Sequence, residues 1–145
     1  MKLSVVDAEI VIRDTVSAMN LTQPFAFDAL TFEDASAAGA GNLMEQNAPF
    51  FLFSSEIIGT RRVGPTIIAP TRQNGDLTIG YFTKNPSLLI DLGLLEQVAN
   101  HFAEKTIEDV RFRTFTPYPP GVRNGFTRYD GVIDFQFELY RGDRT

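Results

Sequence analysis

The last stretch of the chain alternates strictly between apolar and polar side chains. The apolar positions are Ile133, Phe135, Phe137 and Leu139, and the polar positions between them are Asp134, Gln136 and Glu138. Successive side chains of a β-strand point to opposite faces, so this pattern predicts a strand over about residues 126–141 with one buried and one solvated face. The fold must therefore cover one face of a largely antiparallel sheet and leave the other in water.

Four further strands are predicted upstream of this one, besides a short extended segment in which Phe25, Phe27 and Leu30 alternate loosely. They cover residues 49–58, 62–71, 76–83 and 109–116, each an apolar or alternating run of suitable length. Asn74-Gly75 tolerates positive φ and predicts a tight hairpin turn between the second and third of these strands. Asp130-Gly131, just before the alternating stretch, predicts a β-bulge.

Two helices complete the predicted elements. Ser4 and Asp7 form a capping box at the start of a helix over about residues 4–20, which Asn20 closes. Asn85 as N-cap and Pro86 at the first helical position open a second helix, whose apolar residues recur at helical spacing from 88 to 102. The element order predicts an α+β fold, in which two main helices pack on one face of a mostly antiparallel sheet of about four to five strands.

The length of 145 residues and the 43% hydrophobic content fit a single domain, which we expect to span residues 1–145. Residues 33–48 are mostly small and polar, and they predict a flexible surface loop or a segment that orders on a partner. The N-terminus lacks the uninterrupted apolar run of a signal peptide, and no apolar stretch is long enough to span a bilayer. We therefore expect no membrane contact.

The residue inventory excludes several kinds of catalytic site. The chain has no cysteine and one histidine, His101, so thiolate metal sites, cysteine nucleophiles and any site that needs two imidazoles are ruled out. His101 lies near the end of the second predicted helix, where a surface role is expected. The composition points away from an enzyme, and no catalytic, metal or cofactor site is predicted.

Other candidate constellations are weak. Gly59 and Gly64 have phosphate-loop spacing, but the Lys-Ser/Thr that should follow is missing. The carboxylate pairs Asp7/Asp14 and Asp91/Glu96 lie on amphipathic helices, where acidic residues usually form the solvated face. Neither pattern predicts chemistry.

The net charge of −5 hides an asymmetry along the chain. Residues 1–60 are strongly acidic, whereas the rest is nearly balanced and rich in arginine, which is favoured where protein covers a surface. Two windows, residues 60–75 and 110–129, contain no acidic side chain. Their arginines are the candidate subunit or partner-interface residues: Arg61, Arg62, Arg72, Arg111, Arg113, Arg123 and Arg128.

Three interpretations of these arginine windows remain open. Set against an acidic N-terminal region, they make the chain self-complementary in a head-to-tail sense, as a ring of identical subunits requires. A nucleic-acid surface is the rival, because Phe112, Phe115, Tyr118 and Phe126 are interleaved with the second window, although the acidic total argues against it. The same aromatics could instead belong to the strand core and anchor loops.

Several short stretches resemble the tail terminator, or tail completion, proteins of long-tailed, lambda-like bacteriophages. They are Val-Val-Asp-Ala-Glu-Ile-Val-Ile-Arg-Asp-Thr-Val (5–16), Thr-Arg-Arg-Val-Gly (60–64), the Leu-rich helix (88–102), Val-Arg-Phe (110–112) and Gly-Val-Ile-Asp-Phe-Gln-Phe (131–137). The likeness covers most of the chain. Tyr129 stands where relatives often have tryptophan.

The resemblance implies a structural virion protein without catalytic residues. Such proteins form a hexameric ring on the tail tube, end tube polymerisation and present the surface to which the filled head docks. The expected partners are further copies of this chain, the tail tube protein and a head-completion or neck protein. The expected location is the head-proximal end of the tail, after assembly in the host cytoplasm. The alternatives are a small module that binds an anionic ligand, or another neck or completion protein.

Overall fold

The computed structural model describes residues 4–27, 48–62, 71–123 and 125–139. Its elements are α1 (Val5–Ala18), β1 (Phe25–Phe27), β2 (Phe50–Arg62), β3 (Thr71–Thr83), α2 (Leu88–Ala99), β4 (Thr106–Ile107), β5 (Val110–Pro117), β6 (Gly121–Arg123) and β7 (Phe126–Leu139). The predicted loop at 33–48 falls almost wholly outside the described residues.

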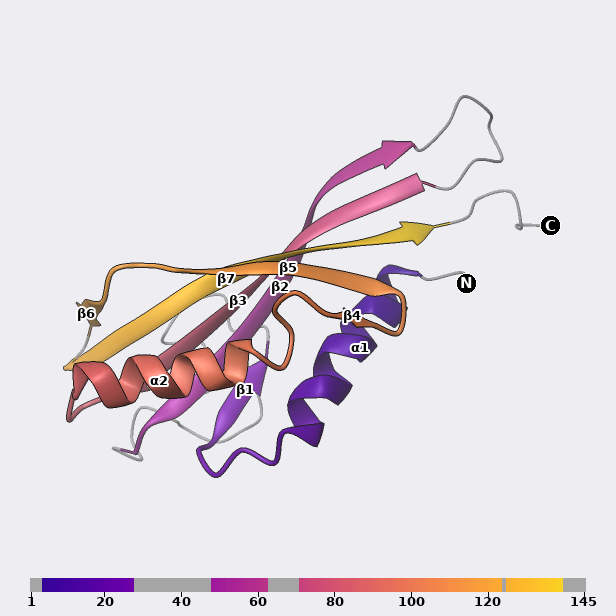
Figure 1. The fold of residues 1–145 in the computed structure, drawn as a ribbon. Coiled ribbons are helices and arrows are strands. Elements are labelled where there is room, and N and C mark those ends of the chain that lie inside the picture. Colours follow the sequence, from indigo (N-terminus) through magenta and orange to yellow (C-terminus); the bar gives the residue numbers. More distant parts are fainter. Residues whose placement is uncertain (1–3, 28–47, 63–70, 124, 140–145) are drawn as a thin grey trace.

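The described strands form one seven-stranded sheet in the order β1-β2-β3-β7-β5-β4, with β6 also paired to β7 (Figure 1). β1 and β2 are parallel, and the other strand pairs among the described residues are antiparallel. The α+β class is confirmed, but the predicted count of four to five strands is too low. β1 lies in the short extended segment that Phe25 and Phe27 predict, whereas β4 and β6 are only two or three residues long, which is too short for alternation to be visible in the sequence.

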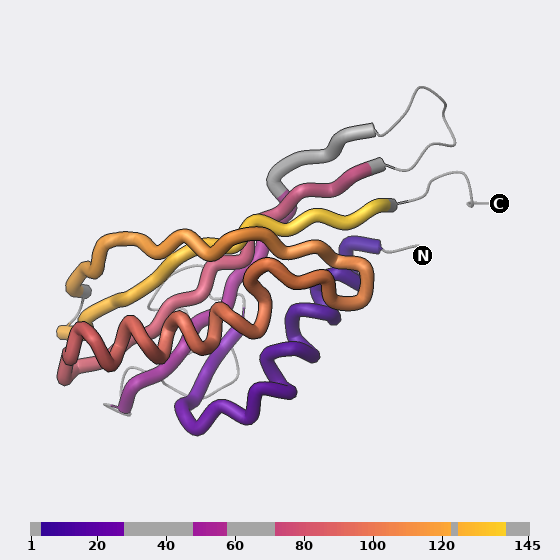
Figure 2. The backbone as a smooth tube through the Cα atoms, in the orientation of Figure 1, coloured from indigo at the N-terminus to yellow at the C-terminus, as the bar shows by residue number. Residues whose placement is uncertain are grey.

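Both helices lie on the same side of the sheet (Figure 2). Ile12 and Val16 of α1, and Leu95 and Ala99 of α2, are buried in one cluster with the inward-facing residues of β2, β3, β5 and β7. The alternating face of β7 supplies Ile133, Phe135 and Phe137 to that cluster, as the sequence predicts. Asp76, Asp134 and their neighbours at alternate positions therefore lie on the outer face of the sheet.

The predicted start of α1 is confirmed. The Asp7 backbone N–H donates to Ser4 Oγ at 3.0 Å, and the Ser4 N–H donates to Asp7 Oδ2 at 2.9 Å. Asn20 follows the helix with a φ of 54°, the left-handed conformation that asparagine tolerates after a helix end. α2 begins at Leu88 with Ser87 as N-cap, two residues later than predicted.

The predicted hairpin turn at Asn74-Gly75 is wrong. Both residues lie inside β3, which pairs with β2 on one side and β7 on the other. A Cβ on Gly75 would lie 2.4 Å from Phe135 Cζ and 2.7 Å from the Glu56 carbonyl oxygen. Glycine is present because the Phe135 ring crosses over its Cα, and the connection from β2 to β3 lies at residues 63–70, outside the described residues.

The predicted bulge at Asp130-Gly131 is also wrong, because β7 pairs with β3 without a shift there. The two register shifts lie elsewhere, between Ile57 and Gly59 on β2 and between Phe112 and Phe115 on β5. In each case the strand gains one residue relative to its partner, which locally bends the strand.

The backbone of the two-residue turn between β4 and β5 is strained, and a glycine substitution would relieve the strain. Glu108 and Asp109 have φ values of 48° and 67°, in the left-handed region that residues other than glycine rarely adopt. Asp109→Gly should therefore raise the free energy of unfolding by about 1 kcal/mol in urea denaturation. Arg111→Gly, in the adjoining strand, should lower it, and a less stable Asp109→Gly variant would contradict the turn assignment.

Beyond Gln136, where the pairing of β5 with β7 ends, the described sheet narrows to three strands. We call residues 60–62, 71–73 and 137–139 the three-stranded end. In Figure 1 the ends of β2, β3 and β7 run together away from α2 and β6. The register across this end joins Thr60, Gln73 and Phe137, then Arg61, Arg72 and Glu138, then Arg62, Thr71 and Leu139.

Candidate assembly surface

Three of the seven candidate arginines gather at the three-stranded end. Arg61 is directly opposite Arg72, and Arg72 is opposite Glu138. The Arg72 Nη2 lies 3.7 Å from Glu138 Oε1, and both side chains are partly exposed. Arg62, one residue further along β2, is opposite Thr71. The sheet register therefore brings the first arginine window together and places an acidic residue beside it.

The second window is divided between the two ends of the sheet. Arg111 and Arg113 are exposed on β5, and Arg111 is opposite Gln136, close to the three-stranded end. Arg123 and Arg128 lie at the other end, where Arg123 pairs with Phe126 and Arg128 with Gly121. The Arg128 Nε is 3.5 Å from Asp130 Oδ2, so this arginine has an acidic neighbour of its own.

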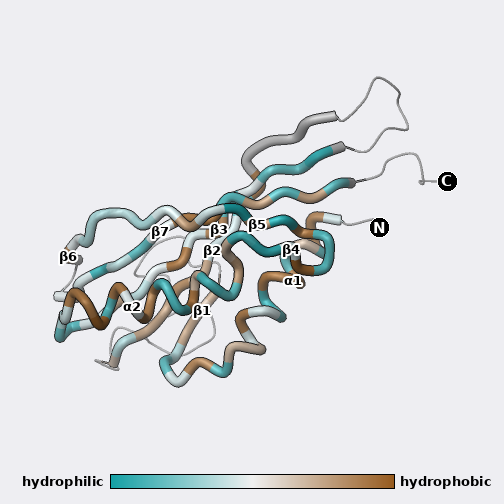
Figure 3. The backbone as a smooth tube through the Cα atoms, in the orientation of Figure 1, coloured by the Kyte–Doolittle hydropathy of each residue, from teal (hydrophilic) through white to brown (hydrophobic). Residues whose placement is uncertain are grey.

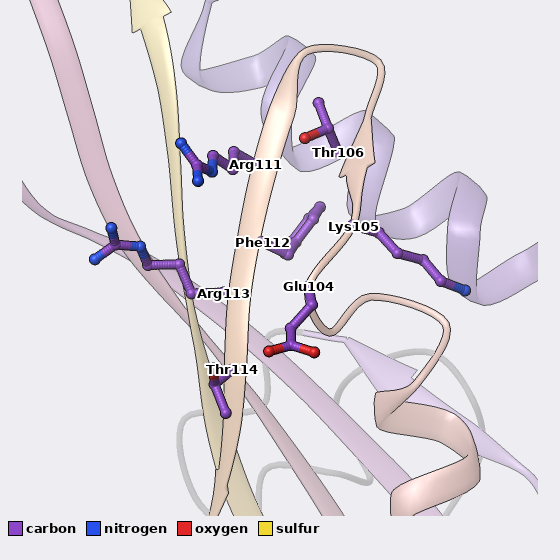
Figure 4. A pocket seen from close by; sticks show the side chains of 7 residues that line it. All are labelled: Glu104, Lys105, Thr106, Arg111, Phe112, Arg113 and Thr114. Carbon is purple, nitrogen blue, oxygen red and sulfur yellow. The ribbon is translucent and has the colours of Figure 1, made fainter.

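A shallow hollow beside β5 is the best candidate for an anion site near Arg111 and Arg113 (Figure 4). Glu104, Lys105 and Thr106 form its other side. The two guanidinium groups point to one side of β5, whereas the Lys105 ammonium points to the other, and the Glu104 carboxylate lies between them. Because the three cationic groups do not surround a common point, the hollow lacks the geometry of an anion-binding site.

The aromatic residues of the second window are mainly core residues. Phe112 and Phe126 are 2% and 1% exposed, and Phe115 packs against the main core. Only Tyr118 is substantially exposed, at 47%. Buried rings cannot stack on bases, so the nucleic-acid interpretation of this window loses three of its four aromatics.

A row of carboxylates crosses the outer face of the sheet. Glu56 on β2, Asp76 on β3 and Asp134 on β7 are directly opposite one another. Arg113, at the β5 bulge, lines the same shallow hollow as Asp76 and Asp134. The sequence shows these residues only as polar positions of separate strands, and their juxtaposition depends on the strand register.

This crowding changes the titration of Asp76. Partial burial raises the pKa of its carboxyl above the usual value, and the hydrogen bond and negative charge of Asp134, with the charge of Glu56, raise it further. A raised folded-state pKa means that the contribution of Asp76 to stability is fully present below its unfolded-state pKa and is lost as pH rises through the folded-state pKa.

Asp76→Asn should therefore stabilise the fold at neutral pH, by a few tenths of a kcal/mol to about 1 kcal/mol, because the amide removes a like charge between opposed strands. The gain should shrink toward zero near pH 3, where Asp76 is protonated in both folded and unfolded states. Urea denaturation at pH 7 and pH 3 measures both values. Glu96→Gln, on the exposed side of α2, is the matched control, and a less stable Asp76→Asn at pH 7 would contradict this account.

Exposed aliphatic side chains lie on both helices. Leu88, Leu89 and Ile90, the first turn of α2, are 55%, 85% and 65% exposed. Figure 3 shows this turn as hydrophobic at the end of the helix. On α1, Val5, Val6 and Ile10 are also exposed. Contiguous exposed apolar side chains of this kind mark surfaces that bind other proteins.

Asp91 is not part of a solvated face, in contrast to the expectation from the helix pattern. It is 4% exposed, and its Oδ2 accepts a hydrogen bond from the Ser87 backbone N–H at 2.8 Å. Burial raises the pKa of the Tyr129 hydroxyl, and a hydrogen bond to Asp91 raises it further. Asp91 thus fixes the start of α2 against β7. His101 is exposed, as expected.

Within the described residues, no group of three or more potential metal ligands is brought together. No helix in this part of the chain is long and apolar enough to cross a membrane. Comparison with protein-family models and with curated proteins found no match to this chain. Two features distinguish the surface of the described residues. They are the arginine and glutamate residues of the three-stranded end, and the exposed aliphatic side chains of α1 and α2.

Proposed function

We propose that this chain is a structural virion protein that caps a phage tail tube as a ring, ends tube polymerisation and provides the surface to which the filled head docks. The observation that carries the proposal is the exposed first turn of α2, where three consecutive aliphatic side chains face solvent. Such a surface suits a subunit that is covered in an assembly better than a protein that acts alone. The α+β fold agrees with the fold that the resemblance to tail terminators implies.

The proposed assembly is a homo-oligomeric ring, a hexamer by that resemblance, at the head-proximal end of the tail. Its partners are the tail tube protein and a head-completion or neck protein. It needs no cofactor and performs no catalysis. The alternative of an anionic-ligand module has less support, because the Lys105 ammonium points to the opposite side of β5 from the Arg111 and Arg113 guanidinium groups.

The direct test mixes the purified chain with tail tubes of the same phage. We expect one ring at one end of each tube in negative-stain images. We also expect tube elongation to stop when the chain is added at a concentration lower than that of the tube protein. Leu89→Asp should fold normally and bind tube ends less well, with Glu96→Gln as the matched control on the same helix. Tubes that grow unchanged, with only monomer present, would refute the proposal.

Charge reversal at the three-stranded end provides a second test. Arg61→Glu with Arg62→Glu should weaken ring assembly, because like-charge contacts at an interface are unfavourable. Far-UV circular dichroism and the unfolding midpoint should remain close to the wild-type values. Mass photometry with and without tubes measures the effect, and rings of normal abundance would show that these arginines lie outside the interface.

A further inference from the structure

The exposed aliphatic turn of α2 lies at one end of the sheet, together with an exposed valine of β6. A short connection joins the start of α2 to Thr83, the last residue of β3, and Thr83 is opposite Thr127 on β7. Val122 of β6 is opposite Thr127 on its other side and is 78% exposed. We call these aliphatic residues the α2–β6 surface: Leu88, Leu89, Ile90 and Val122.

Val122 lies on the same face of the sheet as the two helices. Residues opposite each other in an antiparallel pair share a face, and the faces alternate along each strand. Tyr129 belongs to the core that the helices cover, so Thr127, at the next position of the same face, is on the helix side. Val122, opposite Thr127, therefore extends the aliphatic turn of α2 on one side of the sheet.

The exposed aliphatic residues of α1 lie toward the other end of the sheet. The Ser55 hydroxyl donates a hydrogen bond to Glu9 Oε2, which places the first half of α1 near the middle of β2. α1 leads into β1, and β1 pairs with the start of β2. The helix therefore runs back along β2 and begins at the end opposite to the start of α2 (Figure 1). We call its exposed aliphatic residues the α1 surface: Val5, Val6 and Ile10.

The charges around the two surfaces differ. Asp7 and Asp14 are exposed beside the aliphatic side chains of α1. From Lys84 to Leu95 the only acidic residue is Asp91, and it is buried. Two α1 surfaces in contact would therefore bring carboxylates of two copies together, which is unfavourable. An α1 surface that meets the start of α2 avoids this repulsion.

Gly93 extends the α2–β6 surface along the helix. It lies one turn after Leu89 on the same line, and a Cβ added to it would meet nothing within 4 Å. Glycine inside a helix is unfavourable relative to alanine, and the packing of the described residues gives no reason for it. A missing side chain at this position lets a second helix approach the backbone of α2 closely.

We infer that the α2–β6 surface of one copy packs on the α1 surface of the next copy. This inference rests on the ring of the proposed function and identifies the surfaces through which its copies meet. One head-to-tail contact covers both surfaces of every copy, because each copy contributes the α2–β6 surface to one neighbour and the α1 surface to the other. A symmetric contact between two α2–β6 surfaces would form a closed dimer and leave both α1 surfaces exposed.

The two surfaces are too far apart to meet within one chain. Ser55, which contacts α1, is opposite Leu77 of β3. About 20 Å of extended strand separates Leu77 from Thr83, where the chain turns toward α2. A disulfide requires Cα atoms within about 7 Å of each other, so a disulfide between the two surfaces can form only between copies.

A cysteine pair tests the contact directly, since the natural chain has no cysteine. Val6→Cys with Leu89→Cys should give a ladder of dimers, trimers and larger species under mild oxidation in the presence of tubes. Ile10→Cys with Leu89→Cys is a second pair with a different geometry, and each single variant should give at most dimers. The inference is overturned if neither pair gives a ladder where wild type assembles, or if Leu89→Cys cross-links only to tube protein.

A mixing experiment tests the head-to-tail polarity. Val6→Glu and Leu89→Lys each place a charge in the apolar contact, so each variant alone should assemble at least about tenfold less well than wild type. In an alternating ring of the two variants, the introduced charges meet as an opposite pair at every second contact, and the other contacts are wild type. An equal mixture should therefore recover to within about twofold of wild type.

The control for these charges is Thr116→Glu, at an exposed position of β5 outside both surfaces, which should assemble normally. The unfolding midpoints of all three variants should stay close to wild type, because the substituted side chains are exposed. If the single variants assemble normally, or mixing restores nothing while wild type still caps tubes, the contact is wrong and the proposed function stands. If wild type neither forms rings nor caps tubes, the proposed function itself fails.

Discussion

Gly131→Ala is expected to lower the free energy of unfolding by about 3 kcal/mol, the upper part of the range for overpacked cores. A Cβ at this position would lie 2.5 Å from Phe115 Cζ and 2.6 Å from the Thr116 carbonyl oxygen. The ring can rotate away, but the carbonyl belongs to β5, which is hydrogen-bonded to β7 at this point. Relief therefore requires the two strands to separate.

Urea denaturation monitored by circular dichroism measures this loss. Gly93→Ala is the matched control, because its added Cβ would meet nothing within 4 Å on α2. That variant should gain about 1 kcal/mol from helix propensity. Equal effects of the two substitutions would show that β5 does not approach β7 as closely as described.

Asp91→Ala is expected to cost about 3 kcal/mol, because it leaves the buried Tyr129 hydroxyl without its acceptor and frees the start of α2. The cost should fall when both partners are removed. Asp91→Ala with Tyr129→Phe should therefore be less destabilised than the sum of the two single variants.

The same denaturation assay measures this coupling, with Glu96→Ala on the exposed side of α2 as the control. Strictly additive losses would mean that Asp91 and Tyr129 act independently. Looser attachment of α2 should also change the solvent exposure of the side chains of Leu88, Leu89 and Ile90.

Local chemistry made much of the fold predictable. The Ser4–Asp7 capping box needs only residues three apart, and the alternation from Ile133 to Leu139 needs only one strand. The prediction failed at Asn74-Gly75, where the dipeptide favours a turn but its glycine accommodates the Phe135 ring from the neighbouring strand. That requirement is set by a residue sixty positions away, so no local pattern could reveal it.

The candidate surface was predictable only in part. Arg61, Arg62 and Arg72 lie on neighbouring strand ends, because β2 and β3 pair with each other. The window from Arg111 to Arg128 does not act as one patch, because β5 and β6 pair with different parts of β7. Nothing in the sequence indicated the row of Glu56, Asp76 and Asp134, since each lies on a different strand.

The sequence by itself determined the class of fold, the start and end of α1, the buried face of β7 and the exclusion of cysteine and paired-histidine chemistry. These properties follow from local propensity, side-chain periodicity and residue inventory. The tertiary structure alone decided which charges are neighbours on adjacent strands and that Asp91 is buried. The physical reason is strand register, because a one-residue shift would move every side chain to the opposite face.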